Sequence, residues 1–202
     1  MFRLNIHLAV DEQTVQFCRR VNANIRSLAP SAIIFSDKSP MMPHITLVMG
    51  DFVPSQPFEA LTKATQILAQ RAKPLTLKLS QLYIDPLRGR FVLCDIQENL
   101  ALTELRQMMR ENILGTYLTS PYARPRPPHL TLAHIYAQQE KVQTYLNLIN
   151  EIPSVACSHI EISHVGPKGA CVDRLFAFNL AHEDDLKVRV SSHRLSLVGM
   201  PG

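Results

Sequence analysis

The chain has 202 residues, of which 46% are hydrophobic and 19% charged, enough for one sizeable core or two small lobes that share an interface. No segment has the unbroken apolar length of a membrane span, and the N-terminus carries no basic leader before a hydrophobic block. We therefore expect a protein without a signal peptide that resides in the cytoplasm. A formal net charge of +4 is compatible with an anionic partner but is also common in ordinary soluble proteins.

The cysteines predict reduced, buried thiols. They are far apart and form no CxxC pair of the kind that zinc sites use: Cys18, Cys94, Cys157 and Cys171. The chain also lacks a P-loop, a dinucleotide fingerprint and a nucleophile elbow. We therefore expect neither a metal nor a cofactor.

The first predicted elements are a strand over residues 3–10 and a helix over 12–28. Apolar residues alternate along the strand, and Asp11 provides a cap for the helix. A short apolar stretch, AIIF, and a turn-like SDKSP come next, and residues 43–52 then predict a second strand.

A helix follows Pro57, with its apolar side formed by Leu61, Ile67 and Leu68. Residues 75–83 and 90–97 predict a hairpin, because IDPLRG between them supplies turn residues.

The same order of elements then occurs a second time. The pattern predicts a helix over 99–114, a strand entered through 124–136, a helix over 140–152 and a hairpin of 157–165 with 174–180. This repetition indicates an internal duplication. We expect a single α+β domain over residues 1–180, bilobal, with two pseudo-symmetric lobes whose antiparallel sheets line a central cleft. Residues 181–202 form a tail to which the sequence assigns no role.

Two near-identical pentapeptides occupy matching places in the two halves, PHITL at 43–47 and PHLTL at 128–132. Side chains alternate across a strand, so His44 shares a face with Thr46, and His129 with Thr131. If the lobes face each other, all four polar groups surround one cleft.

That set of groups suits phosphodiester cleavage. The reaction needs one group to take a proton and another to supply one, and histidine, with an unperturbed pKa of about 6.5, does either. Threonine hydroxyls donate hydrogen bonds to the phosphoryl oxygens that gather negative charge. One HxT string alone would favour an ordinary surface or core histidine, but a matched pair favours catalysis by His44 and His129 with Thr46 and Thr131 binding phosphate.

On these motifs, the opening strand and helix, and the duplicated halves, the sequence resembles the two-histidine (2H) phosphoesterases over residues 2–180, and among them the bacterial 2'-5' RNA ligase or RNA 2',3'-cyclic phosphodiesterase group. The resemblance implies that His44 protonates the leaving 3' oxygen and that His129 activates water, giving a 2'-phosphomonoester. Many bacterial relatives carry a basic residue after the second motif, where this chain has His134. Strand alternation places His134 on the face opposite His129.

Other charged and aromatic residues have two interpretations each. Tyr122, Arg124 and Arg126, in a Pro-rich segment before His129, are substrate-binding candidates, or part of a solvated connector. Hairpin-tip cations (Arg88, Arg90 and Lys168) are weak phosphate-binding candidates.

His7 either lines the cleft floor or is a hydrogen-bonded structural histidine. The spacing of His159 and His164 places them on opposite strand faces, which argues against a shared metal.

The sequence therefore predicts a monomeric, metal-independent phosphodiesterase that acts on RNA or nucleotides with a 2',3'-cyclic phosphate or a 2'-5' linkage, ligation being the same chemistry in reverse. Sister families with the same motifs cut 2'-5' oligoadenylates, which is one alternative. A non-catalytic RNA- or nucleotide-binding module is another, although it would have little reason to keep both histidines and both threonines. A metal-dependent hydrolase is disfavoured because no carboxylate and histidine cluster has ligand spacing.

Overall fold

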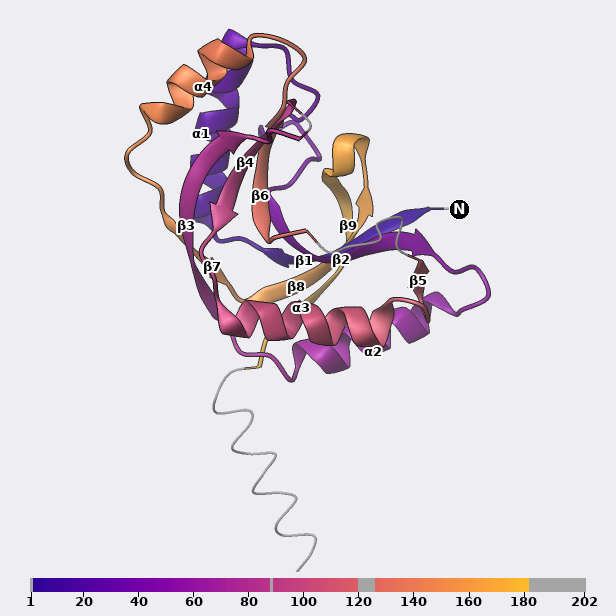
Figure 1. Ribbon diagram of the computed structural model, residues 1–202. Coiled ribbons are helices and arrows are strands. Elements are labelled where there is room, and N and C mark those ends of the chain that lie inside the picture. Colours follow the sequence, from indigo (N-terminus) through magenta and orange to yellow (C-terminus); the bar gives the residue numbers. More distant parts are fainter. Residues whose placement is uncertain (1, 88, 120–125, 182–202) are drawn as a thin grey trace, which may run out of the picture.

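The structure is a computed structural model that describes residues 2–87, 89–119 and 126–181. Helices and strands alternate along most of this part of the chain (Figure 1). The strands are β1 (Arg3–Ala9), β2 (His44–Phe52), β3 (Leu75–Ile84), β4 (Phe91–Ile96), β5 (Leu118–Thr119), β6 (His129–His134), β7 (Ser154–Cys157), β8 (His159–Val165) and β9 (Cys171–Asn179). The helices are α1 (Glu12–Leu28), α2 (Phe58–Ala69), α3 (Leu100–Ile113) and α4 (Gln139–Asn147).

The strands form one antiparallel sheet in the order β7-β3-β4-β6-β2-β1-β8-β9, with β5 beside β2. The two motif strands, β2 and β6, are neighbours at its centre. The hairpin β3–β4 comes from the first half of the chain and pairs with β6, whereas the hairpin β8–β9 comes from the second half and pairs with β1. Each half of the sheet therefore combines strands from both halves of the sequence.

The path of β7 and β8 reflects how strongly the sheet curls (Figure 1). Only Ser158 separates the two strands, yet β7 pairs with β3 at one edge of the sheet and β8 pairs with β1 in the other half. The Asp11 amide, just after β1, donates to the Ala156 carbonyl at 3.1 Å. The prediction of one strand beginning at residue 157 is therefore wrong at its start, because the chain already forms β7 before it crosses to the other half of the sheet.

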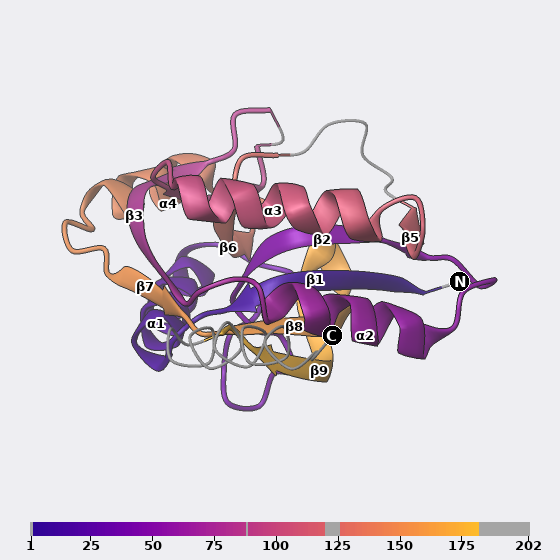
Figure 2. The same cartoon turned by 90° about the horizontal axis from the view of Figure 1, so that it is seen from below.

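Two pairs of helices cover the sheet. Helices α1 and α4 contact each other, with α1 also on β6 and β7 and α4 on β3. Helices α2 and α3 lie side by side, with α2 on β8 and β9 and α3 on β2 (Figure 2). Two of the helix starts have side-chain caps, since Asp11 accepts from the Thr14 amide and Asn99 from the Leu102 amide.

Strand β1 is buried on both faces. Leu4, Ile6 and Leu8 are fully buried, as the alternation predicts, but Asn5 and His7 on the other face are buried as well. The reason is that β1 lies between β2 and β8, and side chains of these neighbours contact Asn5 and His7 on the second face. Polar groups at such positions need hydrogen-bond partners inside the protein.

The remaining differences from the predicted elements are local. Leu61 and Leu68 are buried, but Ile67 is 42% exposed because it lies off the stripe with which α2 meets the core. The last helix ends at Asn147 rather than at residue 152, since the chain must extend toward Pro153 to enter β7. The final strand begins at Cys171, three residues earlier than expected, and the AIIF stretch, residues 32–35, forms no named strand.

Most of the predicted tail, residues 182–202, lies outside the described residues. The final described residues, Leu180 and Ala181, are buried, and the Ala181 amide donates to the Ala72 carbonyl at 2.9 Å.

Candidate active site

The two predicted motifs lie side by side on β2 and β6, which are joined by the pairing of Ile45 with Leu130. Both apolar residues are fully buried, as are Leu47 and Leu132, where the strand pairing becomes irregular. The alternation predicted from the sequence is therefore confirmed from His44 to Thr46 and from His129 to Thr131. It leaves the histidine and threonine side chains on the opposite, open face.

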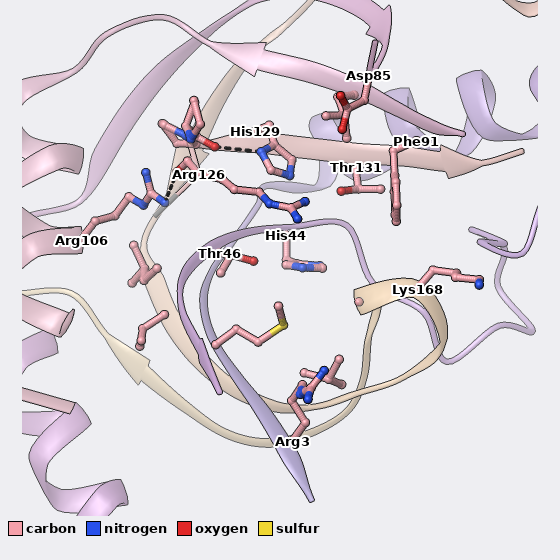
Figure 3. A pocket seen from close by; sticks show the side chains of 18 of the residues that line it. Arg3, His44, Thr46, Asp85, Phe91, Arg106, Arg126, His129, Thr131 and Lys168 are labelled. Atoms are coloured by element: carbon pink, nitrogen blue, oxygen red, sulfur yellow. Dashed lines mark hydrogen bonds between the residues drawn. The ribbon is translucent and has the colours of Figure 1, made fainter. Parts of the chain in front are cut away.

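These four side chains line one cleft of about 550 Å³ (Figure 3). The cleft thus brings together His44, Thr46, His129 and Thr131. Its remaining polar and aromatic lining consists of Arg3, Asp51, Asp85, Phe91, Arg106, Arg110, Arg126 and Lys168.

Each histidine is held by a hydrogen bond to the carbonyl two residues before it. His44 Nδ1 lies 2.9 Å from the Met42 oxygen, and His129 Nδ1 lies 2.8 Å from the Pro127 oxygen. A carbonyl oxygen only accepts, so Nδ1 carries the proton in both rings. In the neutral imidazoles Nε2 is then the unprotonated nitrogen, the atom with which either ring accepts a proton or, once protonated, donates one.

Burial lowers the pKa of both histidines. The pKa of His44 falls to about 4, because burial disfavours the charged ring, the bond to Met42 offsets this only in part, and a charge on His129 would lower it further. The pKa of His129 is also lowered, mainly by burial and against the opposing effect of its bond to Pro127. Both rings are therefore neutral at pH 7 in the ligand-free protein.

Asn5 orients one of the two threonines. Its Nδ2 donates to the Thr46 hydroxyl at 3.0 Å, and its side chain is fully buried beneath the cleft. Because the Thr46 oxygen accepts this bond, its own proton remains available to a ligand. Sequence reasoning did not single out Asn5, although an amide between two core residues of a strand is itself a signal of a partnered polar group.

His7 lies behind the site rather than in it. Its side chain is 1% exposed, its Nε2 is 3.0 Å from Ser163 Oγ and 3.9 Å from Glu161 Oε2, and its ring centroid is 5.1 Å from that of His44. Glu161 in turn pairs with Arg174 at 2.9 Å. The hydrogen-bonded structural interpretation of His7 therefore describes it better than the cleft-floor interpretation.

Only some of the basic residues predicted to bind substrate line the cleft. Arg126 and Lys168 line the cleft, whereas Arg90 does not. Tyr122, Arg124 and Arg88 lie outside the described residues. Sequence reasoning missed Arg106 and Arg110, which reach the cleft from α3. Their spacing of four residues was visible in the sequence, but the direction that this helix face takes depends on packing.

His134 is not among the cleft residues. It is 4% exposed, and its ring lies 4.7 Å from Phe91 and 5.3 Å from Tyr136. The predicted position on the face opposite His129 is wrong, because the pairing of β6 with β4 is irregular at Leu132. His134 pairs with Phe91 and Thr131 pairs with Leu93. Both β4 residues line the cleft, so His134 lies on the same face as the motif, packed against Phe91. In the described part of the chain, no group of three or more histidines, cysteines or carboxylates is placed to hold a metal ion, and no helix is long and apolar enough to cross a membrane.

A curled antiparallel sheet whose two central strands each present a histidine and a threonine to one cleft defines the two-histidine phosphoesterase class of fold. The family model of the 2'-5' RNA ligase superfamily matches residues 15–164. The chain belongs to this superfamily, and the family resemblance read from the paired motifs is confirmed.

Solved structures share the fold at low sequence identity. TT0787 of Thermus thermophilus is 18% identical, with 90% of this chain and 99% of that chain covered and a TM-score of 0.64. LigT of E. coli, solved with 3'-AMP, is 19% identical, with 90% and 99% covered and a TM-score of 0.60. Usb1 of Kluyveromyces marxianus is 12% identical, with 90% and 97% covered and a TM-score of 0.50. No curated protein matches the chain.

Proposed function

We propose that the protein is a metal-independent phosphodiesterase that opens 2',3'-cyclic phosphate ends of RNA or nucleotides to 2'-phosphates. The observation that carries the proposal is the matched pair of histidines, each with Nδ1 bound to the carbonyl two residues earlier, in one cleft with two threonines. LigT, which shares the fold, has been solved with 3'-AMP, ATP and NADP⁺, and ligands of this class support a nucleotide substrate here.

In the proposed reaction a water oxygen attacks phosphorus while the bond from phosphorus to the 3' oxygen breaks. His129 takes the proton of the water, and His44 gives its proton to the 3' oxygen. The product is a 2'-phosphomonoester, and exchange with solvent returns the histidines to their starting states. Thr46 and Thr131 donate hydrogen bonds to the non-bridging oxygens, where negative charge gathers.

The bound substrate favours protonation of one histidine, which the reaction requires and the free site lacks at pH 7. Both histidines have a lowered pKa, so neither carries a proton at pH 7 before binding. A phosphodiester anion between them favours the protonated form of a neighbouring imidazole. Binding therefore raises the population of the singly protonated site that the reaction requires.

Two related activities use the same groups. When a ribose 5' hydroxyl replaces water as the nucleophile, the same transfer makes a 2'-5' linkage, which is RNA ligation. Cleavage of 2'-5' oligoadenylates needs the same acid and base at a different phosphate. A nucleotide-binding module without turnover is the rival from another class.

The test is turnover of the four nucleoside 2',3'-cyclic phosphates in EDTA, with the phosphate position in the product assigned by ³¹P NMR. Wild type is compared with His44→Ala and His129→Ala, and His159→Ala, on β8 outside the cleft, is the matched control. We expect 2'-phosphates from wild type and from the control, and a loss of at least about a thousandfold in kcat in the two cleft variants.

Loss of wild-type activity in EDTA would overturn the metal-independent mechanism. Turnover of a 2'-5' oligoadenylate, without turnover of any cyclic phosphate, would identify the protein as a 2'-5' oligoadenylate phosphodiesterase. Measurable nucleotide binding without turnover of either substrate would identify a binding module instead.

A further inference from the structure

We infer that Arg106 and Arg110 form a binding site for a second phosphate beside the two-histidine centre. The inference rests on the proposed function and narrows its substrate. The preferred cyclic phosphate end would carry another phosphate, either a 5'-phosphate or the next internucleotide linkage of an RNA chain.

The two arginines come from one face of α3. They are four residues apart, a spacing that places side chains next to each other on a helix, and both line the same cleft as His44 and His129. Figure 3 shows Arg106 entering the cleft from the side opposite Lys168. The positive charge of Arg106 is close enough to His129 to lower the pKa of that ring.

Arg106 is held in place before any ligand binds. Its Nη2 donates to the Arg126 carbonyl at 2.6 Å, and its side chain is half-buried against the cleft wall. Its Nε is buried and has no hydrogen-bond partner among the described residues. A buried donor without a partner is unfavourable, so an anion whose oxygen reaches Nε would remove this cost.

Arg106 and Arg110 place two positive charges next to each other on α3. Like charges four residues apart on a helix repel, and burial, together with the charge of Arg110, lowers the pKa of Arg106. Among the described residues no carboxylate forms an ion pair with either arginine, whereas Arg3 at the same cleft pairs with Asp51 at 2.8 Å. A phosphate would relieve the repulsion.

The chemistry of the pair suits a phosphate. A guanidinium presents several N–H groups in one plane and binds two oxygens of a phosphate at once. The scissile phosphate already has the two histidines and two threonines around it. The arginines at the border of the same cleft therefore suit the neighbouring phosphate of a longer substrate.

The experiment compares two substrates that differ by one phosphate, adenosine 2',3'-cyclic phosphate with a free 5' hydroxyl and the same compound with a 5'-phosphate. For wild type at low salt we expect kcat/KM to be about tenfold higher with the 5'-phosphate, the size of a charge-assisted hydrogen bond. In Arg106→Gln and Arg110→Gln the ratio should fall toward one. Arg71→Gln removes an exposed arginine outside the cleft and should keep the wild-type ratio.

A binding measurement separates this inference from the proposed function. The affinities of adenosine 3',5'-bisphosphate and 3'-AMP are compared by calorimetry in the same proteins, and no turnover is needed. If wild type turns over neither cyclic substrate but binds the bisphosphate about tenfold more tightly, and the arginine variants lose that preference, the second phosphate site stands and the proposed function fails.

Equal wild-type values for the members of each pair would overturn the inference, as would a preference that survives both substitutions. Arg110→Gln guards against a folding defect, because Arg110 makes none of the hydrogen bonds that hold Arg106, and circular dichroism confirms that each variant is folded.

Discussion

The pH dependence of activity follows from the proton states of His44 and His129. The proposed reaction needs one ring with a proton and one without. His44 has a pKa of about 4, and the pKa of His129 is below its usual value of about 6.5. The singly protonated site is therefore most populated in mildly acidic solution and decreases tenfold for each pH unit above the higher pKa. At pH 7 about one His44 ring in a thousand carries a proton.

The assay is the pH profile of kcat/KM and of kcat between pH 4.5 and 8.5 with a nucleoside 2',3'-cyclic phosphate. The first quantity reports the free enzyme and the second the substrate complex. We expect kcat/KM to fall tenfold per unit between pH 7 and 8.5. The corresponding fall in kcat should begin at higher pH, because the bound phosphodiester anion raises the pKa of the neighbouring imidazoles.

Proton NMR of the imidazole Cε1–H groups gives a direct reading without substrate. His44 should titrate near pH 4 in wild type and at a somewhat higher pH in His129→Gln, since the charge of protonated His129 lowers the pKa of His44. A His44 midpoint at or above about 6.5 in the free protein would refute the reasoning, because burial would then have no effect on the charged ring.

Three further predictions concern stability and the phosphate site. Leu61→Ala should lower the free energy of unfolding, measured in urea, by about 2–5 kcal/mol, and Ile67→Ala should lower it by less than about 1 kcal/mol. The reason is that only the Leu61 side chain is fully buried. Equal losses would contradict the assignment of the buried face of α2. Asn5→Ala should lower kcat/KM about tenfold, because it removes the hydrogen bond that orients the Thr46 hydroxyl. The same substitution should have a much smaller effect in a Thr46→Val background. Additive effects of the two substitutions would argue against a shared hydrogen bond. Between pH 6.5 and 4 the unfolded chain binds a proton at His44 that the folded protein excludes, so His44 alone should lower the stability by about 3 kcal/mol as the pH drops through this window. An unchanged pH slope in His44→Gln would rule out this source.

The elements and the set of two histidines and two threonines that line the cleft could be predicted from the sequence because they depend on short-range periodicity. Alternation along a strand fixes the relation of His44 to Thr46 wherever the strand lies in the fold. The hairpin of β3 with β4 is likewise specified by its own turn. The predicted duplication and the pseudo-symmetry of the lobes stay predictions.

The site residues that the sequence did not predict owe their positions to packing between distant segments. Asn5 became a partner of Thr46 only because β1 pairs with β2 and is buried on both faces. Arg106 and Arg110 reach the cleft only because α3 packs on β2, a contact between segments that are far apart in the sequence. Periodicity identifies the faces of a helix, but it does not determine which partner each face will meet.

The exchange of hairpins between the two halves of the sheet has a consequence for how the cleft holds its shape. A fragment ending after β4 would contain β2 without the α3 that packs on it, and β4 without the β6 to which it pairs. Neither half of the sequence carries a complete set of neighbours, so folding must await contacts between remote parts of the chain and should be slow for a protein of this size. The same exchange of hairpins places the two histidine-bearing strands of the cleft in one continuous sheet rather than in two bodies joined by a hinge. It therefore fixes His44 and His129 in a common frame before substrate arrives.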